Sequence, residues 1–268
     1  MTNWNHKGFL TLEFKPQLLS DYVQTFRYFK FQESKDYVWD PSGKFELIFQ
    51  LKGQFSQSPI GQESWTVRPT VFVGGLHSES FILKAEKDSA LLSIEFKSSG
   101  AKHFIKEGLN LFKNKVVDLD DVAPLFPSEV KEQLLKNLHN GTIVNCLESA
   151  LIKHFREKEK SGIDLAAQLI LQNKGIIKIG DLADYINLSP SQFRKRFNKE
   201  IGMSPKEYTK IIRIDTLIKQ MKNSTALNLT AIGYQMGYFD QAHFIKDFVS
   251  VTGLSPRNYC KERIPFLP

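Results

Sequence analysis

The chain has 268 residues, of which 41% are apolar, and it carries a formal net charge of +7. This length suits two domains of ordinary size, and the apolar fraction is compatible with packed cores. No apolar run approaches the ~20 residues that a membrane-spanning helix needs, and the first residues contain no continuous apolar stretch typical of a signal peptide. We therefore expect a cytoplasmic protein with no membrane partner.

The positive charge is concentrated in the last part of the chain. Residues 1–159 contain 20 Lys and Arg against 20 Asp and Glu, whereas residues 160–268 contain 16 against 9. A neutral part joined to a basic part indicates that only the basic part meets a polyanion. This division predicts two domains, 1–159 and 160–268.

Short strand-like runs fill the chain from residue 9 to about residue 97. They mix aromatic and β-branched residues with alternating polar ones, and Gly, Pro and Ser separate them. The clearest runs are YVWD (37–40), FELIFQL (45–51), TVFVGG (70–75), SFILKA (80–85) and LLSIEF (91–96). Their spacing of roughly ten residues suits an antiparallel barrel or sandwich.

Helices are expected beside these strands, at about 16–30, 100–110, 128–139 and 143–159. The last has good amphipathic spacing and ends in the charged run REKEKSG, which we interpret as the linker between the domains. A helix just before the basic part is also a plausible dimerisation element.

Candidate small-molecule and metal sites in this region are few. Trp4, Trp39 and Trp65 could line an effector pocket, but aromatic residues in a β-barrel more often form plain core. His77 lacks the HxH pattern with a trailing Glu that a cupin metal site would need, so we predict no metal and no cofactor. No Gly-rich phosphate loop, nucleophile elbow or carboxylate pair indicates a catalytic residue.

One pattern occurs twice between residues 179 and 260. The first copy contains Phe193, Phe197, Gly202, Ser204, Pro205 and Tyr208, and the second contains Phe244, Phe248, Gly253, Ser255, Pro256 and Tyr259. The offset is 51 residues at all six positions. A repeat of this length is usually one supersecondary unit built twice.

Each copy predicts a helix, a tight turn and a second helix. In the first copy Asn187 marks the turn, because Asn tolerates the left-handed conformation, and Ser189 followed by Pro190 marks the start of the next helix. Gly237 and Asp240 take the corresponding roles in the second copy. The sequence thus predicts helix-turn-helix units at about 179–200 and 229–250, joined by a largely buried helix at about 205–222.

The two copies resemble the DNA-binding domain of the AraC/XylS family of transcription regulators. DLADYINLSPSQFRKRFNKEIGMSPKEY (181–208) is similar to the family's first unit and AIGYQMGYFDQAHFIKDFVSVTGLSPRNY (231–259) to its second. Arg213 stands where the family usually has an arginine, whereas Gly233 replaces its usual alanine. The β-rich half is similar to the cupin-like sensor half of some members. The resemblance implies an α+β two-domain regulator, with a β-rich sensor or dimerisation domain before an all-α DNA-binding domain.

The resemblance also implies which residues meet the DNA. The second helix of a helix-turn-helix lies in the major groove, and its early outward residues reach base edges. These positions are Ser191, Gln192, Arg194 and Lys195 in the first unit and Gln241, Ala242, His243 and Lys246 in the second. The alternative to a base contact, for any one of these residues, is that its side chain is solvated or contacts a phosphate. Arg196, Lys199, Lys210 and Lys261 are assigned to the DNA backbone or to solvent.

The implied partners are double-stranded promoter DNA in the bacterial nucleoid, RNA polymerase if the protein is an activator, a small-molecule effector, and a second copy of the chain. Two alternative functions, each of a different class of protein, are also compatible with the sequence. One is a DNA-binding protein without an effector, either architectural or constitutive. The other is a DNA-repair alkyltransferase on the same module, which would need a reactive cysteine. Neither Cys146 nor Cys260 stands in a basic or His-flanked setting.

Overall fold

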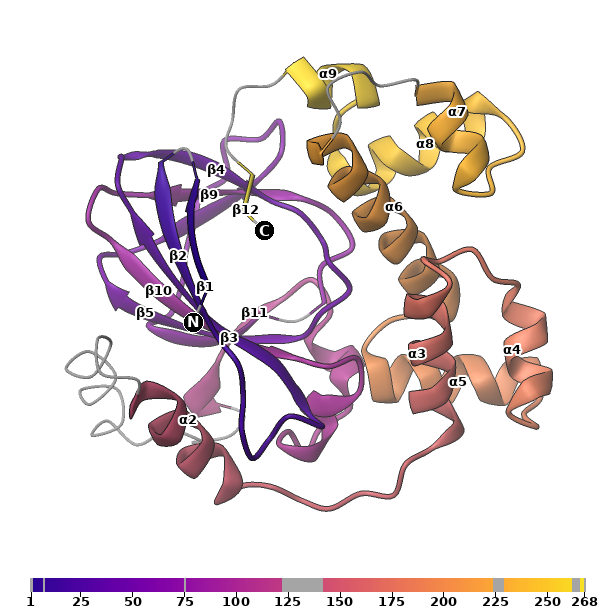
Figure 1. The fold of residues 1–268 in the computed structure, drawn as a ribbon, viewed down its shortest axis with the longest axis horizontal. Helices are drawn as coiled ribbons and strands as arrows, with labels where there is room; N and C mark the ends of the chain where they lie inside the picture. The colour runs from indigo at the N-terminus through magenta and orange to yellow at the C-terminus, as the bar shows by residue number, and fades with distance from the viewer. Residues whose placement is uncertain are drawn as a thin grey trace.

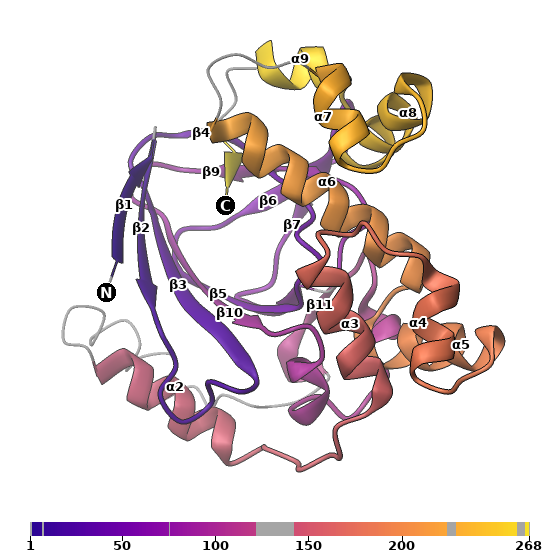
Figure 2. The ribbon, with the colours of Figure 1, turned by 45° about the vertical axis from the view of Figure 1, so that its right-hand side comes forward.

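The computed structural model describes residues 2–6, 8–74, 76–121, 142–223, 229–261 and 266–267. A β-rich domain precedes a helical domain, as the sequence predicts (Figure 1). Helices α3 to α9 lie on one side of the sheets, and α2 lies on another side, beneath them, in both views (Figure 2).

The described strands form two sheets. The first has the order β1-β2-β3-β10-β5-β8-β11 and the second β12-β4-β9-β6-β7, and neither closes on itself. All pairs are antiparallel except β12 with β4. The bounds are β1 Thr2–His6, β2 Phe9–Phe14, β3 Val23–Phe31, β4 Lys35–Trp39, β5 Glu46–Lys52, β6 Ser56–Pro59, β7 Thr66–Val67, β8 Val71–Gly74, β9 Phe81–Ala85, β10 Ala90–Phe96, β11 Val116–Asp118 and β12 Phe266–Leu267.

The first sheet is the middle of three layers. Residues such as Leu47, Phe49 and Ile94 point from it toward α2 (Thr142–Ile152), and Ile48 and Phe72 point toward the second sheet. This alternation follows from the two-residue period of a strand. β10 is buried along its whole length because it lies in the centre of the first sheet and both its faces are covered.

The helix predicted at 16–30 is wrong. Residues from Val23 onward form β3, whose alternating side chains face two different cores. The preceding turn is held by the buried Glu148 of α2, whose Oε1 accepts hydrogen bonds from three successive backbone N–H groups at 2.8–2.9 Å. These tertiary partners outweigh the local helical pattern.

Other expected helices are shorter than predicted. The segment 100–110 contains two short 3₁₀ turns, η1 Gly100–His103 and η2 Leu109–Phe112, and a third, η3 Leu119–Asp121, follows β11. Helix α2 ends at Ile152 instead of residue 159. Beyond it, Phe155 packs against Tyr22 and stacks on His103, and the Arg156 N–H donates to the His103 carbonyl. The helix expected at 128–139 lies outside the described residues.

A buried acidic pair lies on the first sheet. Glu95 forms ion pairs with Arg27 (3.4 Å) and Lys44 (2.6 Å), whereas Glu46 accepts a hydrogen bond from the Ser93 hydroxyl. Burial, together with the charge of Glu95, raises the pKa of Glu46 to about 7 from an ordinary value of 4.5. The folded chain therefore keeps a proton on Glu46 over a pH range in which the unfolded chain has released it.

This raised pKa makes a stability prediction. The contribution of Glu46 to the free energy of unfolding is fully present below pH 4.5, and it is lost as the pH rises through about 7. We expect Glu46→Gln to be more stable than the wild type at pH 8, by a larger margin than at pH 5, because glutamine never ionises. Urea titrations at both pH values measure this, with the exposed Glu86→Gln as control. An equal margin at both pH values would contradict the prediction.

The helical domain contains two small cores connected by one helix. Its helices are α3 Gly162–Gln172, α4 Ile179–Tyr185, α5 Pro190–Ile201, α6 Pro205–Asn223, α7 Leu229–Gln235, α8 Gln241–Thr252 and α9 Pro256–Lys261. One core surrounds Phe193 and Phe197, and the other surrounds Phe244 and Phe248. Helix α6 supplies residues to both, as its wide apolar stripe predicts.

Candidate nucleic-acid interface

Helix α5 is the second helix of the first unit. The Ser189 hydroxyl accepts a hydrogen bond from the Gln192 N–H (3.3 Å), and Pro190 occupies the first turn. At the other end Gly202 adopts a left-handed φ of 109°, which a side chain would strain. Phe193 and Phe197 are buried, so the remaining positions of the first two turns face outward.

Helix α8 repeats this construction. The Asp240 carboxylate accepts a hydrogen bond from the His243 N–H (2.7 Å), and Gly253 ends the helix with a φ of 72°. The two turns differ in residue but share the left-handed conformation, with φ 54° at Asn187 and 77° at Gly237. Both second helices therefore begin after their capping residue and end at a left-handed glycine.

All eight predicted DNA-contacting residues are exposed. In the first unit Ser191, Arg194 and Lys195 line one groove, whose opposite wall includes Leu111 and Lys113 of the β-rich domain. Gln192 is already engaged, because its side-chain oxygen accepts from the Ser189 N–H (3.1 Å) and hydroxyl (3.0 Å). Its oxygen thus caps the helix in this structure.

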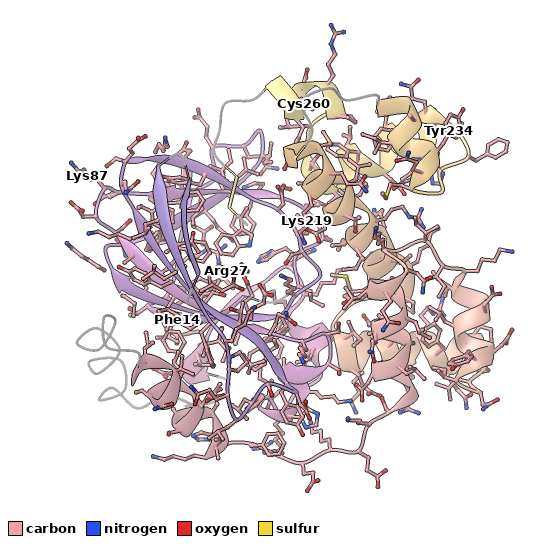
Figure 3. The ribbon with its side chains drawn as sticks, viewed as in Figure 1. Phe14, Arg27, Lys87, Lys219, Tyr234 and Cys260 are labelled. Atoms are coloured by element: carbon pink, nitrogen blue, oxygen red, sulfur yellow. The ribbon has the colours of Figure 1, made fainter. Side chains whose placement is uncertain are left out.

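In the second unit the four predicted residues lie in the first two turns of α8. Gln241 and Ala242 are exposed, and Nε2 of His243 lies 3.7 Å from the Asp247 carboxylate. Lys246 and His243 line a second groove, which lies between the two units. Tyr234 of α7 points away from the core into solvent (Figure 3).

This second groove gathers positive charge that the sequence pattern did not reveal. Lys178, Lys206, Lys210, Arg213 and Lys246 line it, together with the acidic Glu207 and Asp247. They come from the start of α4, from α6 and from α8, so only the folded chain brings them together. We call this groove the basic groove. Lys210 was assigned to the DNA backbone or to solvent, whereas Lys178 and Lys206 were missed.

Helix α6 fixes the distance between the units. Its 19 residues span about 28 Å at 1.5 Å per residue. Arg213 also links the two units. Its Nη2 donates a hydrogen bond to the Gly175 carbonyl (2.7 Å), and its guanidinium lies 5.1 Å from the Tyr238 ring. One arginine thus contacts the turn before α4 and the turn before α8, which explains its place in the connecting helix.

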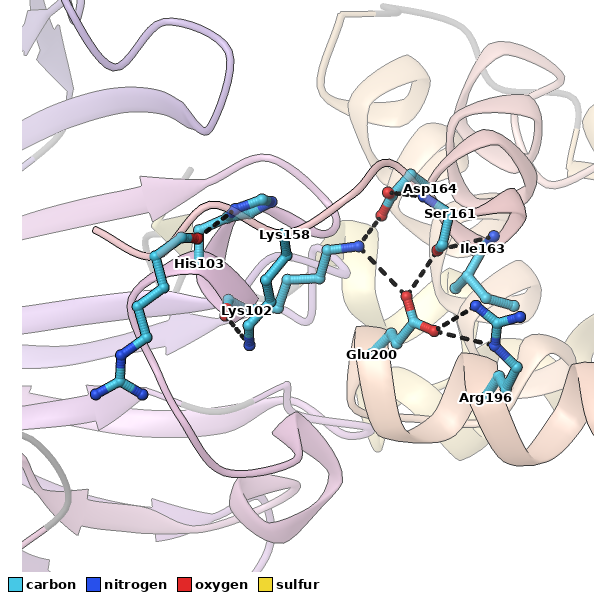
Figure 4. A network of polar contacts seen from close by, with 9 residues as sticks. Lys102, His103, Lys158, Ser161, Ile163, Asp164, Arg196 and Glu200 are labelled. Carbon is cyan, nitrogen blue, oxygen red and sulfur yellow. Dashed lines mark hydrogen bonds and ion pairs between the residues drawn. The ribbon is translucent and has the colours of Figure 1, made fainter. Parts of the chain in front are cut away.

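Ion pairs attach α5 to the β-rich domain. Lys102 of η1 reaches Asp164 of α3 (2.6 Å) and Glu200 of α5 (3.3 Å) (Figure 4). Glu200 also accepts hydrogen bonds from the Ser161 hydroxyl (2.7 Å) and from Arg196 (3.2 Å). The Lys102 side chain is only 9% exposed, so these pairs are shielded from solvent.

Removing this lysine should weaken the attachment between the domains. We expect Lys102→Met to destabilise the chain by about 1–3 kcal/mol, because two half-buried carboxylates lose their shared cation. Calorimetric unfolding of the variant, compared with the more exposed Lys30→Met, measures the loss. If Lys102→Met loses no more stability than Lys30→Met, the ion-pair network contributes nothing to the stability of the fold.

Further contacts join the two domains. The Tyr208 hydroxyl donates to the Ser98 hydroxyl (3.0 Å), and Lys113 reaches Glu207 (2.5 Å). Near the end of the chain the Tyr259 hydroxyl donates to the Asp40 carboxylate (2.5 Å). The helical domain is therefore attached at the first turn of α6 and at α9.

Comparisons with known proteins agree with this geometry. Residues 182–262 match the model of a family described as a helix-turn-helix domain, and residues 13–118 match one described as a domain of unknown function. The probable transcriptional regulator LumQ of Photobacterium leiognathi is 28% identical over 161 residues, which are 55% of this chain and 63% of that protein. The arabinose operon regulatory protein of Escherichia coli is 28% identical over 89 residues, covering 32% of this chain and 30% of that protein.

The fold likeness extends over nearly the whole chain. A structure of ToxT from Vibrio cholerae superimposes with a TM-score of 0.50 over 95% of this chain and 98% of that one, at 12% identity. The helix-turn-helix part of the chain is therefore similar to regulators of the AraC type. The aligned stretches span less than two thirds of the lengths of LumQ and the arabinose regulator.

Gly233 is one position at which the sequence departs from the AraC/XylS pattern that it resembles, since alanine is usual there. A methyl group on Gly233 would lie 3.4 Å from the Phe244 ring, which is an ordinary contact. The family's usual alanine would therefore fit at this position. Nothing in the described residues requires glycine there.

The surroundings of the two cysteines do not activate their thiols. Burial raises the pKa of both the Cys146 and the Cys260 thiol, whereas reactive cysteines have a lowered pKa. Cys260 lies on the exposed surface of α9 (Figure 3). In the part of the chain that the structure describes, no group of three His, Cys, Asp or Glu side chains could hold a metal ion, and no helix is long and apolar enough to cross a membrane.

Proposed function

We propose that the protein is a sequence-specific DNA-binding transcription regulator that inserts α5 and α8 into successive major grooves. One observation carries the proposal: two matching helix-turn-helix units share a single connecting helix, and both expose the first turns of their second helices. Successive major grooves on one side of the duplex are about 34 Å apart. A connecting helix of about 28 Å is close to this repeat, and the difference favours a bend in the DNA.

The predicted residues take distinct roles in this arrangement. Arg194 and Lys195 suit guanine O6 and N7, Gln241 suits adenine, and Ala242 could touch a thymine methyl group. Ser191, Gln192, His243 and Lys246 complete the set of contacts. The basic groove between the units would face the phosphates of the intervening turn, and its lysines would neutralise them without reading sequence.

The β-rich domain, which we assign to residues 1–159 and to a cupin-like class, would regulate the basic domain of residues 160–268. The groove in front of Arg194 and Lys195 has a wall from η2 of the β-rich domain, so DNA must share that space or displace the wall. An effector or a second copy of the chain acting on the β-rich domain would thereby control access to α5. Promoter DNA and, for an activator, RNA polymerase are the partners, in the nucleoid of the cytoplasm.

Fluorescence anisotropy with the full chain tests this function. Labelled DNA from upstream of its own gene is titrated at several salt concentrations, with scrambled DNA of equal length as competitor. A specific regulator should prefer one sequence by about 10³-fold or more at physiological salt. An architectural binder would instead bind specific and scrambled DNA with equal, steeply salt-dependent affinity. It would do so for other intergenic sequences as well as for the DNA upstream of its own gene.

A further inference from the structure

The repeat gives each outward position of α5 an equivalent position on α8. Phe193 and Phe197 are equivalent to Phe244 and Phe248, and all four side chains are buried. The capping residues and the terminal glycines of the two helices are also 51 residues apart. Because each residue of a helix turns the chain by the same angle, equivalent residues point in the same direction relative to the two cores.

The outward face of α5 is polar. Its residues are Ser191, Arg194, Lys195, Asn198 and Lys199, which line the groove that α5 shares with η2. Arg194 lies near the middle of this face, one turn after Ser191 and one turn before Asn198. It is also the residue whose guanidinium suits a guanine edge.

The equivalent face of α8 is largely apolar. The residues at the offset of 51, in the same order, are Ala242, Ile245, Lys246, Val249 and Ser250. Lysine is kept at one position, whereas three of the other four positions have changed from polar to apolar residues. Ile245 stands where the first unit has Arg194. The sequence analysis assigned its neighbours to the DNA but passed over Ile245, because only one apolar residue, Ala242, was considered there.

The three apolar residues of α8 form one continuous strip. Ala242, Ile245 and Val249 follow one another at spacings of three and four residues, which places them on successive turns of one side of the helix. Ile245 is 37% exposed and Val249 is 39% exposed. Single exposed apolar residues are common on protein surfaces, but three aligned ones indicate a surface that another molecule covers. We call these three residues the apolar strip.

The neighbours of the apolar strip indicate that DNA covers it. Lys246 lies between the strip and the basic groove, into which His243 and Asp247 of α8 also point. DNA that lies along the basic groove therefore meets the strip as well. In the major groove the apolar group is the C5-methyl group of thymine, and every other base-edge group is a hydrogen-bond donor or acceptor. An isoleucine would leave such a polar group without a partner.

We propose that Ile245 recognises the C5-methyl group of a thymine in the half-site bound by α8. Its equivalence to Arg194 places it within reach of a base edge, and Ala242 extends the same apolar contact toward the start of the helix. The inference rests on the proposed function and deepens it. The two units then use different chemistry: α5 recognises guanine through hydrogen bonds, and α8 recognises thymine through an apolar contact.

Replacing thymine by deoxyuridine tests this contact, because the change removes only the methyl group and keeps every hydrogen-bonding group of the base pair. The preferred duplex of the full chain is prepared with each thymine of the α8 block replaced in turn. This block is the one that Gln241→Ala relaxes. Anisotropy titrations at one salt concentration should show affinity about fourfold lower at one or more of these thymines, the effect expected for one uncovered methyl group.

Variants assign the methyl contact to one side chain. Ile245→Ala should bind the thymine and the deoxyuridine duplexes with equal affinity. Ile245→Arg, which restores the residue of the first unit, should lose the preference for thymine and favour guanine at that position. Ile152→Ala is the matched control, because Ile152 of α2 is 42% exposed and lies in the β-rich domain. It should keep the full preference for thymine over deoxyuridine.

Several results would overturn the proposal. One is equal affinity for thymine and deoxyuridine at every position of the block, which would leave the apolar strip to a protein partner. Another is a preference for thymine that persists in Ile245→Ala or in Ile245→Arg. Thermal unfolding checks that each variant folds, and if Ile245→Ala does not, Ile245→Arg decides, because its long aliphatic stem covers the same surface.

Failure of this inference is distinguishable from failure of the proposed function. If the full chain prefers no sequence, the proposed function is refuted and this inference with it. If the chain prefers a sequence in which deoxyuridine replaces thymine without loss, this inference alone is refuted.

Discussion

Replacing Phe197 by alanine is expected to lower the free energy of unfolding of the helical domain by about 3–5 kcal/mol. Phe197 is fully buried and its ring packs edge-on against Phe193 and Tyr208, with ring centres 5.5 and 5.6 Å apart. The substitution therefore removes a contact shared by α5 and α6. Urea unfolding followed by the helical circular dichroism signal measures the loss.

The chain offers a matched control for this substitution. Phe239 precedes α8 and is 90% exposed, so Phe239→Ala makes the same chemical change at a surface position and should alter stability by less than about 0.5 kcal/mol. Phe248→Ala, the position equivalent to Phe197 in the second unit, should behave like Phe197→Ala because it is also fully buried. Similar losses for Phe197→Ala and Phe239→Ala would refute the assigned core.

The second large effect concerns DNA affinity. Arg194→Ala should weaken binding to the preferred sequence by about 1–3 kcal/mol and relax the choice of base at one position, because a bidentate contact to guanine is lost. Affinity for scrambled DNA should fall much less. Anisotropy titrations with the preferred sequence and its single-base variants measure both quantities.

Arg257→Ala is the control for this prediction. Arg257 is an exposed arginine on α9 and belongs to neither second helix, so its removal should not change base preference. If Arg194→Ala instead lowers affinity for every DNA equally, Arg194 contacts phosphate, and the assignment of α5 as a reading helix loses its main support.

The helical domain was largely predictable because its signals are local. Ser189, Pro190 and Gly202 fix the ends of α5, and the repeat transfers the same boundaries to α8. The buried stripe of α6 follows from its own periodicity. The capping role of Gln192 is equally local, since it stands three residues after Ser189, but its exposed position favoured a DNA contact in the sequence analysis.

The β-rich domain was predictable only in outline. The five strongest runs correspond to β4, β5, β8, β9 and β10, but β3 was taken for a helix because its neighbours β2 and β10 are not visible in its own sequence. Arg68 and Glu46 lie 22 positions apart in sequence and line one cavity only because the sheets pack. Likewise Lys178 and Lys206 join Lys246 only after α6 has set the spacing of the two units.

The central claim is that α5 and α8 read successive turns of one duplex. Selection of bound sequences from random duplexes by the full chain, repeated with Arg194→Ala and with Gln241→Ala, tests it most directly. We predict two short sequence blocks with centres about 10 base pairs apart, of which Arg194→Ala relaxes one and Gln241→Ala the other. A single block, or no enriched sequence at all, would contradict the account.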